Sequence, residues 1–167
     1  MNRDDYWNLI ESCRLADSPD DLAAAVKDKL SNMPLDEVLA FDRVQQDLMQ
    51  ESYTWRLWGA AYLINGGCSD DGFDYFRGWL ITQGRDAFQR ALADPETLAD
   101  LDIDPEDSYC ECEDMVSAAF TAYYTRTGES PPISPTLSPG PGLGDDWDFD
   151  DDDEMQARYP RLFEKFG

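Results

Sequence analysis

One stretch decides the fold of this chain: WRLWGAAYLINGGCSDD, residues 55–71. Its first half places large apolar side chains among small ones at helical spacing, which is typical of a helix buried on most sides. Asn65-Gly66-Gly67 follows, and these residues tolerate the left-handed backbone that ends a helix. Ser69 then caps a new helix, with Asp70 and Asp71 facing the positive end of its dipole. The stretch therefore predicts two helices joined by a tight turn.

Helical spacing of apolar residues continues on both sides of this hairpin. The longest pattern begins at Leu35 and runs without a clear stop to Ile64, so we expect one long helix there. No convincing β-alternation or internal repeat is present. The fold class is therefore predicted to be all-α, a compact multi-helix domain around a central, aromatic-rich helical hairpin. The expected helices cover residues 4–16, 19–33, 35–64, 70–83, 85–93, 96–101 and 108–126, and a short amphipathic piece over 155–166 breaks near Tyr159-Pro160.

The composition changes after the last long helical pattern. Residues 129–144 are rich in Pro, Ser and Gly and contain five prolines, which is typical of an irregular linker or surface wrap. We expect three parts: a helical domain over 1–128, this linker over 129–144, and an acidic, aromatic segment with a short C-terminal helix over 145–167. The last part is expected to dock on the domain.

The charge balance excludes several classes of partner. The 167 residues hold 36 Asp plus Glu against 13 Lys plus Arg, a net charge of −23. Such a chain is repelled by a nucleic-acid backbone and by an anionic membrane. The longest apolar run, Leu57–Ile64, is far shorter than the ~20 residues of a membrane span. Because the N-terminus lacks a signal-peptide pattern, we expect a soluble, cytoplasmic protein.

Most of the excess charge lies in two short windows. Residues 94–114 contain ten acidic residues and residues 145–154 contain eight, and neither window has a Lys or Arg. The rest of the chain is only mildly acidic. An uncompensated anionic rim the size of the second window would attract a basic protein or imitate a nucleic-acid backbone.

The residues available for catalysis and metal binding are limited. Without histidine, Ser–His–Asp and Cys–His catalysis and His-ligated metal sites are absent. A calcium loop over 100–111 is unfavourable, because Pro105 stands where a glycine is needed. We therefore expect no metal site, and the sequence identifies no cofactor. The cysteines show no C-x-x-C spacing and are expected to be buried free thiols: Cys13, Cys68, Cys110 and Cys112.

The hairpin turn is the candidate ligand site. Its helix N-terminus, thiol and carboxylates between aromatic walls suit a small-molecule or metal pocket. Each residue also has a structural explanation, as turn, cap, core or ion pair, and that explanation stays open. Cys68 precedes a helix N-terminus, which favours a lowered pKa, while the following carboxylates oppose it. The candidate residues are Trp55, Trp58, Asn65, Cys68, Ser69, Asp70, Asp71, Arg77 and Trp79.

The second acidic window is the candidate partner-binding segment. It interleaves two large aromatic side chains with carboxylates, which indicates docking, either back onto the domain or into a basic, apolar groove of a partner. The candidates are Asp146, Trp147, Asp148, Phe149, Asp150, Asp151, Asp152 and Asp153.

The central segment also resembles a known family. The motif from Trp55 to Asp71, continuing through Phe73, Tyr75-Phe76-Arg77 and Trp79-Leu80-Ile81, is similar to a bacterial, mainly actinobacterial, family defined as a domain of unknown function. The similarity extends to Tyr6-Trp7, Asp94-Pro95, Cys112-Glu113-Asp114 and a Tyr-Pro-Arg-Leu end, nearly the whole chain. It implies no activity, cofactor or substrate.

Three functions are open at this point. The first is an interaction or regulatory domain whose anionic surface meets a basic protein. The second is a small-molecule or metal-binding domain, possibly an enzyme, with its site at the turn, where carboxylates would do any acid–base work. The third is a nucleic-acid-mimicking inhibitor. A real cavity at the turn would favour the second.

Overall fold

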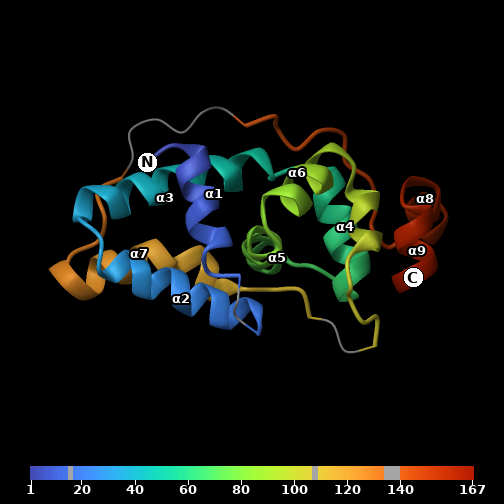
Figure 1. Ribbon diagram of the computed structural model, residues 1–167. Helices are drawn as coiled ribbons and strands as arrows, with labels where there is room; N and C mark the ends of the chain where they lie inside the picture. Colours follow the sequence, from blue (N-terminus) through green and yellow to red (C-terminus); the bar gives the residue numbers. More distant parts are fainter. Residues whose placement is uncertain (15–16, 107–108, 134–139) are drawn as a thin grey trace.

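The computed structural model describes residues 1–14, 17–106, 109–133 and 140–167 (Figure 1). All secondary structure within these ranges is helical, which confirms the all-α fold class. The elements are α1 (Arg3–Glu11), α2 (Pro19–Ser31), α3 (Leu35–Glu51), α4 (Trp55–Asn65), α5 (Asp70–Thr82), α6 (Arg85–Ala93), the 3₁₀ helix η1 (Pro95–Asp100), α7 (Glu113–Thr127), α8 (Asp152–Arg158) and α9 (Pro160–Phe166).

Helix α5 is the centre of the fold. Figure 1 shows it end-on, with α1, α2, α3 and α7 on one side and α4, α6, α8 and α9 on the other. Every residue from Phe76 to Thr82 is buried. This part of α5 therefore packs against neighbours all round, whereas Trp55, Trp58 and Tyr62 of α4, the helix expected to be buried on most sides, are half-buried.

The predicted turn between α4 and α5 forms as expected. Gly66 ends α4 in the left-handed conformation, with φ of 65°. Ser69 precedes α5 and its hydroxyl accepts a hydrogen bond from the Gly72 amide at 3.1 Å. Both helix ends are thus explained by local chemistry.

The long helix expected over 35–64 is wrong, because the chain breaks at residues 52–54. Helix α3 ends at Glu51, and Thr54 begins α4 by accepting a hydrogen bond from the Leu57 amide at 3.2 Å. The buried Ser52 hydroxyl donates to the Leu48 carbonyl at 2.8 Å and so satisfies part of the α3 terminus. Apolar spacing is similar on both sides of the break, so periodicity alone could not reveal it.

Two further helix boundaries differ from expectation. Helix α1 ends at Glu11, and residues 15–16 of the expected helix lie outside the described residues. Helix α7 begins at Glu113, not near residue 108, which is itself outside them. The residues before α7 run alongside α5 instead, because the Cys112 amide donates to the Tyr75 carbonyl at 2.9 Å.

The C-terminal aromatic residues contact α4. The ring centroids of Phe149 and Trp55 are 4.8 Å apart, and the Trp55 indole donates to the Trp147 carbonyl at 3.2 Å. The Tyr159 hydroxyl donates to the Arg56 carbonyl at 2.6 Å. Gly59 leaves room for these rings, because a Cβ there would lie 2.7 Å from the Tyr159 hydroxyl and 3.1 Å from Trp147.

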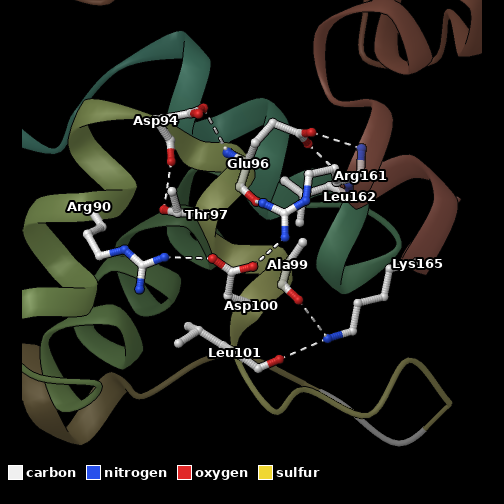
Figure 2. A network of polar contacts seen from close by, with 10 residues as sticks. All are labelled: Arg90, Asp94, Glu96, Thr97, Ala99, Asp100, Leu101, Arg161, Leu162 and Lys165. Carbon is white, nitrogen blue, oxygen red and sulfur yellow. Dashed lines mark hydrogen bonds and ion pairs between the residues drawn. The ribbon is translucent and has the colours of Figure 1, made fainter.

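Polar contacts join the C-terminal helix α9 to η1 (Figure 2). Asp100 accepts hydrogen bonds from Arg90, at 2.6 Å, and from Arg161. The Glu96 carboxylate accepts from the Arg161 and Leu162 amides at 2.8 and 3.1 Å, and so caps α9. The two arginines lower the pKa of Asp100. Part of the first acidic window is therefore compensated within the chain by Arg90 and Arg161.

We predict that Gly59→Ala loosens the C-terminal segment. The added methyl group cannot fit beside Tyr159 and Trp147, so unfolding should become easier by about 1–3 kcal/mol. Hydrogen exchange should rise first in residues 145–166. Tyr159→Phe is the matched control, since it removes only the hydroxyl and should cost about 1 kcal/mol. Unchanged exchange in Gly59→Ala would contradict the packing described here.

Across the described residues, no helix combines the length and apolarity needed to cross a bilayer.

Candidate functional site

The polar side chains of the α4–α5 turn bond to backbone groups of the fold. The Asn65 side chain accepts from the Cys110 amide at 3.0 Å and donates to the Cys110 carbonyl at 3.3 Å. Ser69 caps α5, and Asp71 is exposed in its first turn. These contacts give Asn65 and Ser69 structural roles and leave no cavity that they line among those described.

The Cys68 thiol lies in a half-buried place beside Trp58 and Glu111. The Trp58 indole donates to the Cys68 carbonyl at 2.9 Å. Burial, followed by the Glu111 carboxylate, raises the pKa of Cys68 to about 12. This shift favours the protonated thiol at neutral pH, which is the less nucleophilic form. The pKa of Cys68 is thus raised by burial and not lowered, although this residue lies just before the N-terminus of α5.

The other thiols and the acidic side chains offer no metal site in the described part of the chain. Burial also raises the pKa values of Cys110 and Cys112 to about 12. No group of three or more Cys, Asp or Glu side chains is arranged to hold a metal ion in residues 1–14, 17–106, 109–133 and 140–167.

The three candidate tryptophans belong to packing and not to one pocket. Trp58 stacks on Phe73, with ring centroids 4.9 Å apart and 12° between the planes. Trp79 is buried beside Phe76. Trp55 faces the C-terminal aromatic residues. The aromatic walls expected around the turn are thus the core and the contact with the C-terminal segment.

A groove lies near the turn, along the face of α5 that carries Asp70, Asp74 and Arg77. It has a volume of about 660 Å³ and runs between α3, α5, α7 and residues 130–133. Of the predicted ligand residues, it is lined by Asp70 and Arg77. We call it the acidic groove; the side chains that line it include Asp42, Gln46, Met49, Tyr53, Asp70, Asp74, Arg77, Val116 and Phe120.

Arg77 forms one wall of the acidic groove and is almost wholly buried. Its guanidinium donates to the carbonyls of Met49 and Phe73 and to the Asp74 carboxylate. It also lies over the rings of Tyr53 and Phe73, 4.8 and 4.7 Å from their centroids. Burial lowers the pKa of Arg77, and Asp74 opposes that shift. Arg77 thus joins α5 to the end of α3, where the Met49 carbonyl also accepts a hydrogen bond from the Ser52 hydroxyl at 3.2 Å.

Three carboxylates line the acidic groove. The Tyr53 hydroxyl donates to Asp70 at 3.2 Å, and Gln46 donates to Asp42 at 2.5 Å. Burial raises the pKa of Asp42, and Arg43 partly offsets this. Asp74 bonds to Arg77. The groove thus presents more negative than positive charge, and its guanidinium is already engaged within the fold.

At the groove, the buried Gln45 joins three helices. The Tyr6 hydroxyl of α1 donates to Gln45 of α3 at 3.2 Å. Gln45 in turn donates to the carbonyls of Met115 and Val116 of α7, both at 3.0 Å. Hydrogen bonds of one groove residue, Gln45, therefore link α1, α3 and α7.

Sequence reasoning missed most residues of the groove. Three of the α3 side chains that line it, Asp42, Gln46 and Met49, follow one another at helical spacing, as do Asp70, Asp74 and Arg77 on α5. Either set has the periodicity of an ordinary solvated face. Only the packing of α3 against α5 and α7 brings the two faces together.

The partner-binding candidates lie in the segment that packs on α4, and none of them lines the acidic groove. Trp147 and Phe149 pack on the domain, and Tyr62 donates a hydrogen bond to Asp150. Asp151 caps α8 by accepting from the Glu154 amide at 3.1 Å. The remaining acidic side chains of the segment are exposed: Asp146, Asp148, Asp152 and Asp153.

Comparison with protein families gives one match. Residues 1–125 match the family described as a protein of unknown function, DUF4240. The chain belongs to this family. Comparisons with curated proteins and with solved structures found no match.

The residues that match DUF4240 include most of the acidic groove. They include α3 and α5 and nearly all of α7, and therefore the three helices that form the acidic groove. Trp147, the second acidic window and the Tyr-Pro-Arg-Leu end lie beyond the matched residues. The helical walls of the groove thus lie in the DUF4240 part of the chain, and residues 130–133, which also line it, follow that part.

Proposed function

We propose that this DUF4240 chain is an interaction domain that binds a basic segment of a partner protein in the acidic groove. The observation that carries the proposal is the set of carboxylates in the groove, Asp42, Asp70 and Asp74. The guanidinium beside them is already bonded to protein acceptors. A Lys or Arg of the partner would gain charge-assisted hydrogen bonds there.

The charge of the whole chain supports the same class of partner. A net charge of −23 attracts cationic proteins over a distance of about a Debye length and repels nucleic acids and anionic membranes. The association rate should therefore fall steeply as ionic strength rises. The four free cysteines agree with the reducing, cytoplasmic location that the sequence favours.

A matched pair of variants tests the proposed site. We expect Asp42→Asn with Asp70→Asn to weaken binding of a Lys- and Arg-rich synthetic peptide by about tenfold or more. Asp71→Asn with Asp153→Asn removes the same charge from exposed positions outside the groove, and should weaken binding by about twofold or less. Fluorescence anisotropy of the labelled peptide measures both. Equal losses in the two double variants would show long-range attraction without a site in the groove.

Two other functions have less support. A small cationic molecule is the second candidate, because a volume of about 660 Å³ lies in the range of small-molecule sites. A nucleic-acid mimic needs free carboxylates spaced along a surface, whereas Glu96 and Asp100 are engaged within the chain. The interaction domain accounts for more of the geometry.

A further inference from the structure

Helix α7 exposes an aromatic pair beside the acidic groove. Phe120 and Tyr124 are one helical turn apart, and their rings stack with centroids 5.9 Å apart and 8° between the planes. The two side chains are 46% and 50% exposed. Its helical spacing places Phe120 in the apolar stripe of the helix expected over 108–126. In the structure Phe120 also lines the groove.

A third apolar side chain adjoins the same groove. Ile133 lines it from the segment that follows α7 and is 95% exposed. Single exposed apolar residues are common on proteins and need no explanation. Of the five large hydrophobic side chains exposed in the described ranges, two line the groove together with the three carboxylates, and a third, Tyr124, stacks on Phe120. Such a patch is typical of an interaction surface.

The charge of the chain determines what can cover this patch. A second copy would bring another −23 charge toward a groove that already presents Asp42, Asp70 and Asp74. Repulsion between like charges therefore opposes self-association at this face. A free metal ion or polyamine would satisfy the carboxylates but would leave Phe120, Tyr124 and Ile133 in water. The occupant that suits both the carboxylates and the apolar side chains carries positive charge and apolar surface together.

We infer that the partner segment is amphipathic, with a Lys or Arg next to a large apolar anchor such as Leu, Phe or Trp. The cation binds at Asp70 and Asp42, and the anchor packs on Phe120 and Ile133. This inference rests on the proposed function, and it adds that the apolar wall contributes to affinity and selects a protein segment over other cations.

Two synthetic peptides of about ten residues test the inference. Both have the same lysines at the same positions, and one has leucine where the other has serine. We expect the Lys/Leu peptide to bind the unchanged protein about tenfold more tightly than the Lys/Ser peptide. Phe120→Ser should reduce this preference to about threefold or less. Tyr109→Ser removes an exposed aromatic side chain outside the groove and should leave the preference unchanged.

Each outcome gives a separate answer. Equal binding of the two peptides overturns the amphipathic partner and leaves the proposed function in place, provided that the Asp42 and Asp70 variants still weaken both. If neither peptide binds, both the proposed function and the amphipathic partner are overturned. A preference for leucine that survives Phe120→Ser overturns the assignment of the anchor to this wall. Ile133→Ser, at a side chain with almost no contacts to lose, provides the same test if Phe120→Ser does not fold.

Discussion

Replacing Gly78 with alanine is expected to lower the free energy of unfolding by about 3 kcal/mol, at the upper end of the cost of overpacking. A Cβ at this position would lie 2.5 Å from the Cys112 carbonyl oxygen and 2.7 Å from the Val116 side chain. The first of these is backbone, so it cannot rotate away. Helix α5 and the chain entering α7 would have to separate, and the better helix propensity of alanine offsets only about 1 kcal/mol.

Gly72→Ala is the matched control in the same helix. A Cβ at Gly72 would lie 3.1 Å from the Glu111 carboxylate and 3.2 Å from the Ser69 hydroxyl, and both are side-chain atoms that can move. We expect its free energy of unfolding to stay within about 1 kcal/mol of the unchanged protein. Urea denaturation measures both variants. Equal stability of the two would show that the close approach of α5 and α7 is not as described.

Arg77→Leu is the second substitution with a large expected effect, a loss of about 2–4 kcal/mol. The guanidinium bonds to two carbonyls and one carboxylate in different directions, and a leucine satisfies none of them. Asp74 is half-exposed and stays hydrated when its partner is removed, so the loss should remain below that of a fully buried ion pair. Arg77→Lys should lose at least half as much, because one ammonium group cannot replace the planar fork.

Arg85→Lys is the control for Arg77. Arg85 pairs with Asp4 at 2.6 Å, but both side chains are well exposed, and such pairs contribute little to stability. We expect a change of less than about 1 kcal/mol, measured by urea denaturation. If Arg77→Lys were as mild as Arg85→Lys, the three hydrogen bonds of Arg77 would not contribute to joining α3 and α5.

The parts of the fold that the sequence predicted well are those set by local chemistry. Gly66 ends α4 because glycine adopts the left-handed backbone, and Ser69 begins α5 because its hydroxyl accepts a hydrogen bond from the helix. Both effects act within a few residues. The break at residues 52–54 was missed because Thr54 caps α4 inside an uninterrupted apolar pattern. Its clearest tertiary support, the bond from Arg77 to the Met49 carbonyl, comes from another helix.

The candidate site was predicted only in part, for a related reason. Asp70 and Arg77 were candidates because they flank the hairpin turn, and the structure brings them to the acidic groove. Asp42 and Phe120 come from distant parts of the chain, and no local pattern links them to α5. In the same way, nothing near Asp100 indicates that it binds Arg161. Sequence shows where charge is, and tertiary packing determines which charges remain free.

The most direct test of the central claim is to find where a basic ligand binds. The Lys/Leu peptide would be titrated into ¹⁵N-labelled protein and followed by amide chemical shifts. We predict that the largest shifts fall on the acidic groove, at Gln46, Tyr53 and Asp74 among others, and saturate together. Shifts confined to residues 145–154 would contradict the account, because they would place the basic ligand on the C-terminal acidic segment instead.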